Sequence, residues 1–125
     1  VYSSLNQLTC IWTSKSAGSD FEVDHLIPFS IWKNNDLWNL LPASRTANNQ
    51  KRDKIPSIQR LEKSKTLIFE YWELLKTQYP KRFEQEFRIA LLGEQIVKDW
   101  KEAGFEKIKE SCQYLVNIRG FELWK

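Results

Sequence analysis

The chain of 125 residues contains six tryptophans and seven phenylalanines and carries a formal net charge of +3. This length and apolar content suit one domain with its own core, and no apolar run is long enough to span a bilayer. The two cysteines, Cys10 and Cys112, stand far apart, which excludes a disulfide-rich secreted scaffold and favours the reducing cytoplasm. Cys10 is expected to be a small buried residue.

The first predicted element is a hairpin. Side chains alternate over residues 8–13, and the Ser- and Gly-rich segment 14–20 is typical of a loop that leads into a second strand over residues 21–24. That strand ends in Asp24 and His25, the single histidine of the chain. We expect the strand to deliver both side chains to its end, which is a good platform for chemistry.

A long connection follows the histidine. Pro28 disfavours helix at the residue before it and keeps the histidine on an extended segment. Residues 30–33 predict one helical turn, and residues 34–36 predict the turn that ends it. Trp32 and Trp38 could stack on nucleic-acid bases or anchor this connection in the core, and we favour core packing.

Positive charge is concentrated in residues 43–65, which hold seven Lys or Arg against two Asp or Glu. Residues 1–42 have a net charge of −2, and residues 66–125 are balanced. Within the basic segment, residues 46–54 predict a short helix that Pro56 stops or kinks. A charge run is often only a solvated helix face, but this one follows polar motif residues and favours contact with a nucleic-acid backbone.

The rest of the chain is predicted to be helical. Apolar residues recur at i, i+3, i+4 and i+7 over residues 68–75 and again within residues 80–93, where proline fits the first turn and glycine the end. Two shorter helices are expected over residues 94–103, before Gly104, and over residues 106–116. The fold class is therefore α+β and mostly helical, in a single domain.

The polar residues form an ordered set. Asp24, His25, Asn39, Asn48 and Lys51 follow one another in the spacing D-H-x13-N-x8-N-x2-K. A single Asp-His pair is more often structural, and loop asparagines are usually caps or Asx-turns. The whole set, over about residues 8–56, resembles the HNH endonuclease family, whose signature is an Asp-His or His-His pair, a middle Asn, and a final His or Asn followed shortly by a lysine.

The resemblance implies a ββα-metal unit of hairpin, loop and helix, packed here against C-terminal helices. It implies that His25 is the general base, that Asp24 and Asn48 bind one divalent ion, and that Asn39 fixes the loop of His25. Asn49 is the alternative to Asn48 as the ligand, because the two are adjacent and only the spacing to Lys51 favours Asn48. Asn at the last motif position makes this an HNN variant, and the paired Cys-x-x-Cys motifs that hold zinc in many relatives are absent.

These residue types suit phosphodiester hydrolysis. An imidazole, with an unperturbed pKa near 6.5, is well placed to take a proton from water at neutral pH. A cation can stabilise charge on the phosphate and the leaving oxygen. Carboxylate and amide oxygens favour Mg²⁺ or Mn²⁺ over zinc.

The predicted function is metal-dependent hydrolysis of double-stranded DNA, without a membrane partner. The residues expected to hold the DNA backbone are Arg45, Lys51, Arg52 and Lys54, which give affinity but no sequence information. The alternative is a non-catalytic DNA-binding module on the same fold. The chain begins at Val1 and contains no methionine. We therefore expect it to be part of a larger protein, with a targeting domain or subunit, as in restriction, anti-phage defence or RNA-guided systems.

Overall fold

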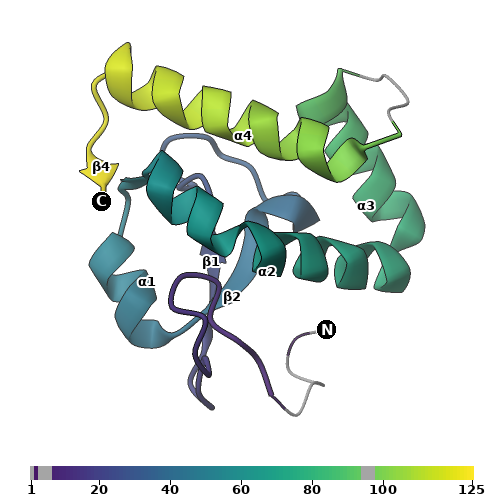
Figure 1. Cartoon of the computed structure of the whole chain (residues 1–125), viewed down its shortest axis with the longest axis horizontal. Coiled ribbons are helices and arrows are strands. Elements are labelled where there is room, and N and C mark those ends of the chain that lie inside the picture. Colours follow the sequence, from purple (N-terminus) through teal and green to yellow (C-terminus); the bar gives the residue numbers. More distant parts are fainter. Residues whose placement is uncertain (1, 3–6, 94–97) are drawn as a thin grey trace.

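The computed structural model describes residues 2, 7–93 and 98–125, and in this part the chain has the predicted α+β fold (Figure 1). Its elements are β1 (Glu22–His25), the 3₁₀ helix η2 (Leu37–Asn39), β2 (Leu40–Ala43), α1 (Arg45–Lys51), β3 (Ile55–Pro56), α2 (Ile58–Gln78), α3 (Pro80–Phe87), the π-helix η3 (Arg88–Leu92), α4 (Trp100–Asn117) and β4 (Leu123–Trp124). Helix α2 packs against both α3 and α4. No helix in these ranges is both long and apolar enough to cross a membrane.

The hairpin that carries Asp24 and His25 is built from β1 and β2. The strands are antiparallel, with Glu22 opposite Ala43 and His25 opposite Leu40. The sequence does not predict strand β2, because Pro42 lacks the N–H that a strand interior normally donates. The pair accommodates the proline because β2 has only one strand neighbour, and the carbonyl oxygen of Pro42 still accepts from the backbone N–H of Ile11 at 3.0 Å.

Residues 8–13 do not form a strand paired with β1, so this part of the prediction is wrong. Thr9 makes a single antiparallel bridge with Ser16, and the chain between them turns back on itself. The neighbours Cys10 and Ile11 are both fully buried. The segment therefore has no separate inner and outer face, and the alternation of its side chains does not indicate a strand. The expectation that Cys10 is buried is confirmed.

Helix α1 lies close to its predicted position but ends early. Ser44 caps its first turn by accepting a hydrogen bond from the backbone N–H of Ala47 at 3.2 Å. The helix ends at Lys51, three residues before the predicted end, because Arg52 adopts a positive φ of 53°. The chain then enters β3, which pairs in parallel with β4.

Helix α4 runs without interruption through Gly104, so the predicted break between two helices at this glycine is wrong. The predicted start of the first of them, residues 94–97, lies outside the described residues. A Cβ added at Gly104 would overlap the ring of Phe87 at the end of α3. The glycine therefore permits a close approach of α4 to α3, and it does not end a helix.

The helices predicted within residues 68–75 and 80–93 are confirmed, whereas residues 30–33 form no helix. The apolar stripe within residues 68–75 is buried along α2, Pro80 opens α3, and Gly93, with a φ of 60°, follows the last residue of η3. Trp38 is fully buried, and Trp32 packs against the core beside it with ring centroids 5.5 Å apart. Core packing is thus the role of both tryptophans.

The segment after α4 returns to the hairpin unit. Through β4 it lies beside β3, and Trp124 packs edge to face on Trp12 with ring centroids 5.3 Å apart. The guanidinium of Arg60, on α2, lies 3.7 Å from the centroid of the Trp124 ring. Trp12 and Trp124, from opposite ends of the sequence, therefore meet beside β1.

Candidate functional site

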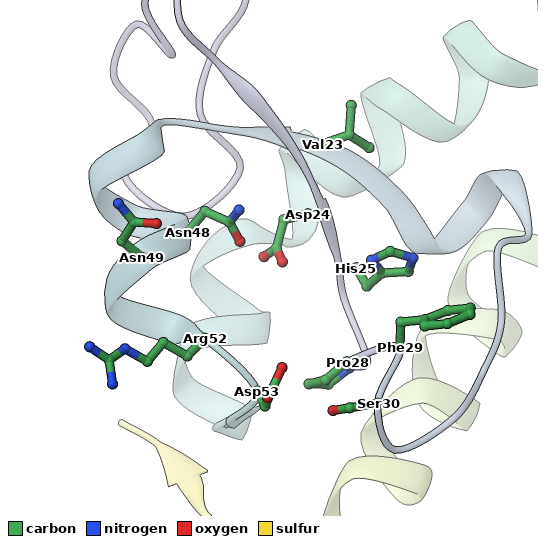
Figure 2. Close-up of a pocket in the computed structure, with 10 residues that line it drawn as sticks. All are labelled: Val23, Asp24, His25, Pro28, Phe29, Ser30, Asn48, Asn49, Arg52 and Asp53. Carbon is green, nitrogen blue, oxygen red and sulfur yellow. The ribbon is translucent and has the colours of Figure 1, made fainter.

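A pocket of about 670 Å³ lies where the end of β1 faces α1 (Figure 2). Its lining includes Asp24 and His25 from β1 and Phe29 from the loop that follows β1. It also includes Asn48 from α1 and Arg52, the residue directly after that helix. As neighbours on a strand, Asp24 and His25 leave β1 on different sides, yet both reach this pocket. The structure therefore brings the two ends of the sequence motif together.

Asp24 is held through both of its carboxylate oxygens. The indole N–H of Trp12 donates to Oδ2 at 2.7 Å, and the ammonium nitrogen of Lys51 lies 3.4 Å from Oδ1. Asp24 is 6% exposed, whereas the apolar Val23 beside it is 43% exposed, so β1 turns a polar side chain inward. Burial raises the pKa of Asp24, and the Lys51 and Trp12 donors oppose that rise.

Lys51 does not point from α1 into solvent as predicted. Its side chain is fully buried, and Nζ donates to the carbonyl oxygen of His25 at 2.8 Å in addition to its contact with Asp24. Burial lowers the pKa of Lys51, and the neighbouring Asp24 carboxylate opposes the change. An ammonium enclosed in this way cannot reach a phosphate outside the protein, so the prediction that Lys51 contacts DNA is wrong.

His25 has a hydrogen-bond partner that the sequence motif does not include. Its Nε2 lies 2.8 Å from the side-chain oxygen of Asn35, in the loop between β1 and η2. Its ring also lies beside Phe29, with centroids 5.4 Å apart and a tilt of 48°. The imidazole therefore sits between a polar partner and an aromatic ring.

Asn39 is fully buried and ties the loop after His25 to itself. Its Oδ1 accepts from the backbone N–H of Ile27 at 3.0 Å, and its Nδ2 donates to the carbonyl oxygens of Ile27 at 3.2 Å and Asn34 at 3.1 Å. These bonds use every polar atom of the amide side chain. They join the backbone two residues after His25 to the residue that precedes Asn35.

Asn48 and Asn49 differ in direction. Figure 2 shows the amide of Asn48 turned toward Asp24 and the amide of Asn49 turned away from it. The Nδ2 group of Asn48 donates to Glu22 at 2.8 Å, an arrangement that directs the NH₂ group to the strand and leaves the amide oxygen for another partner. Of the two asparagines, Asn48 has the geometry that suits a ligand.

The other predicted DNA contacts lie at the surface. Arg45 and Arg52 are exposed at opposite ends of α1, and Arg52 lines the pocket. Lys54 is half-buried, with its ammonium 3.6 Å from a carboxylate oxygen of Glu122. The two arginines are therefore the better placed of the predicted phosphate contacts.

The segment that forms this pocket matches a known protein family. Residues 11–57 match the model of a family described as HNH endonuclease. These residues are an HNH endonuclease domain. The domain runs from the turn that carries Trp12 to the cap of α2, and it includes the whole pocket. The matched family is one of nucleases, which are hydrolases of phosphodiester bonds, and the match covers this segment of the chain. No solved structure matches the chain.

HNH nucleases generally use a divalent metal ion, and the donor set of this HNH domain fits a hard cation. Asp24 offers a carboxylate and Asn48 an amide oxygen on the same pocket. Within residues 2, 7–93 and 98–125, no three His, Cys, Asp or Glu side chains gather as a metal cage. Mg²⁺ commonly binds through few protein oxygens and completes its shell with water and phosphate, so two protein ligands are compatible with it.

Sequence reasoning missed the residues that hold those of the motif. Trp12 and Asn35 bond directly to Asp24 and His25, and Glu22 bonds to Asn48. No spacing rule connects Trp12 or Asn35 to the motif, because a turn and a loop of the HNH domain bring them to it. Glu22 could have been found, since it lies two residues before Asp24 on the same side of a predicted strand.

Proposed function

We propose that this HNH domain hydrolyses phosphodiester bonds of double-stranded DNA with the help of a divalent ion. The observation that carries the proposal is the meeting of Asp24, His25 and Asn48 at one pocket, with Arg52 on its wall. A base, two oxygen ligands and a cationic side chain are the groups that hydrolysis of a phosphodiester requires. Arg52 both lines the pocket and is exposed, so a DNA strand can reach this part of its wall.

His25 takes the proton from the attacking water. Its side chain is partly exposed in the pocket, and its Nε2 is engaged by Asn35, so the other ring nitrogen is the one available to water. Asp24 and Asn48 would hold a Mg²⁺ or Mn²⁺ ion, which supplies positive charge at the phosphate and the leaving oxygen when bound. Asn39 keeps the loop after His25 in place through its three hydrogen bonds. Following the family pattern, the products carry 5′-phosphate and 3′-hydroxyl ends.

Arg45 and Arg52 hold the DNA backbone, with Lys54 as a weaker contributor because of its pairing with Glu122. Such contacts add affinity without reading sequence. We accordingly propose that the domain is the nuclease module of a restriction, anti-phage defence or RNA-guided system, in which a separate domain or subunit selects the target.

A plasmid-nicking assay tests the proposed reaction. Supercoiled DNA should be nicked in the presence of Mg²⁺ or Mn²⁺, and a chelator should stop the reaction reversibly. Asn48→Ala should also weaken Mn²⁺ binding in titration calorimetry, whereas Asn49→Ala should leave it unchanged. DNA binding without cleavage under any of these metals would instead identify a non-catalytic module, and equal Mn²⁺ binding by both variants would reject Asn48 as a ligand.

The basic residues give a separate prediction. Each of Arg45→Gln and Arg52→Gln should weaken DNA binding about equally for all sequences, because each removes an ionic interaction with a phosphate. The slope of log affinity against log salt should fall by about 0.9 for each phosphate that is no longer neutralised. Lys81→Gln is the matched control, since Lys81 is an exposed cation on α3, far from α1 in Figure 1. An unchanged salt slope in both arginine variants would show that neither side chain meets a phosphate.

A further inference from the structure

The contact between His25 and Asn35 restricts where the imidazole carries its proton. A neutral imidazole has one N–H and one bare nitrogen, and the hydrogen bond made by one nitrogen decides which form is present. Nε2 of His25 lies 2.8 Å from Oδ1 of Asn35. A side-chain amide oxygen can only accept, so the neutral tautomer that fits this contact carries its proton on Nε2 and leaves Nδ1 bare.

The turn that presents Asn35 is held on both sides. Before it, the carbonyl oxygen of Asn34 accepts from the buried Asn39 at 3.1 Å, and the side chain of Asn34 accepts from the backbone N–H of Asp36 at 2.8 Å. After it, the carboxylate of Asp36 accepts from the indole N–H of the buried Trp38 at 2.9 Å. Asn35 is therefore the exposed tip of a turn whose two flanking residues are fixed to the core.

A further bond connects this turn to the helical part of the protein. The backbone N–H of Leu37 donates to Glu86 on α3 at 2.9 Å, and Glu86 also receives a hydrogen bond from Arg82 at 3.1 Å. The position of the amide that faces His25 thus depends on residues outside the HNH domain as well as on the loop within it.

We propose that Asn35 is a positioning residue that selects the Nε2–H tautomer of His25 and so leaves Nδ1 as the nitrogen that accepts the proton from water. The catalytic part of this statement rests on the proposed function, but the tautomer itself does not. The bond from Asn35 fixes the direction of the ring as well as its proton, and the contact with Phe29 in the same loop limits its rotation.

The chain offers a direct test, because His25 is its only histidine. In protein labelled with ¹⁵N at histidine, the two nitrogen shifts of one ring report its tautomer without metal or DNA. At a pH well above the ordinary imidazole range, the folded protein should contain more of the Nε2–H form than the same protein unfolded in urea. Asn35→Ala should bring the populations to the unfolded value, and Asn35→Asp, which keeps an acceptor oxygen, should restore the Nε2–H form.

The cleavage rate gives the second readout. Asn35→Ala should lower kcat by about 10- to 100-fold, as large as the usual cost of removing the hydrogen-bond partner of a metal-bound histidine, with little change in KM. Asn35→Asp should recover most of the rate. Lys33→Ala, another exposed change in the same loop, is the control for a merely loosened loop and should change neither the tautomer nor the rate.

The outcomes separate the two proposals. A folded protein in the Nδ1–H form, or one whose tautomers do not respond to Asn35→Ala, would overturn the role of Asn35 even if the protein cuts DNA. A protein that shows the expected tautomers but never cuts DNA would leave the positioning of the ring intact and reject the proposed hydrolysis.

Discussion

His25→Ala should lower the rate of DNA cleavage by about 10²- to 10⁴-fold, the contribution of a positioned general base. The side chain is partly exposed at the pocket, and its hydrogen bond joins it to an exposed asparagine. Its removal should therefore leave the fold intact. The measurement is single-turnover nicking of plasmid DNA with saturating Mg²⁺, alongside circular dichroism and DNA affinity.

Two results would contradict the role of His25. Cleavage by His25→Ala at close to the original rate would show that another group takes the proton. Disappearance of the folded spectrum would show that the histidine is structural. Unchanged DNA affinity together with cleavage slowed by about 10²- to 10⁴-fold is the combination that the mechanism requires.

Lys51→Met should destabilise the folded protein by about 3–5 kcal/mol, because it leaves the buried Asp24 without its cationic partner. The ammonium of Lys51 lies 3.4 Å from Asp24 Oδ1 and donates to the His25 carbonyl at 2.8 Å, so the change also leaves that oxygen without this donor. Urea unfolding monitored by tryptophan fluorescence measures the effect.

Lys54→Met is the matched control, since the ion pair of Lys54 with Glu122 is largely exposed and should contribute about 0–1 kcal/mol. In the double variant Lys51→Met/Asp24→Asn, the free energy of unfolding should fall by less than the sum of the two single changes, because no buried carboxylate remains. A decrease below about 1 kcal/mol in Lys51→Met would show that Asp24 does not need this partner.

Several features of the site were predictable because they depend on local chemistry. Pro80 marks a helix start, and the order of Asp24, His25, Asn39 and Asn48 carries the resemblance that the family match over residues 11–57 bears out. These signals act over a few residues, or through a spacing that the family fold requires. They do not require knowledge of which distant segments meet.

The errors arise where a distant segment decides the role of a residue. Lys51 has the sequence context of a surface cation, and only the position of β1 makes it a buried partner of Asp24. Gly104 has the appearance of a helix terminator, and only the ring of Phe87 shows why a glycine is needed there. Asn35 is one of several polar residues in a loop, and its contact with His25 depends on the whole path of that loop.

The packing of Trp124 on Trp12 can form only late in the synthesis of the chain. Trp12 holds the carboxylate of Asp24, and the ring that covers Trp12 comes from β4, which follows all the helices in the sequence. Chains are made from the amino end, and domains generally fold as units. A ribosome that has translated every motif residue has therefore not yet added the tryptophan that packs on Trp12. The support that Trp12 receives from β4 can form only after the helices have been synthesised, so Asp24 can meet Trp12 before Trp12 is itself covered.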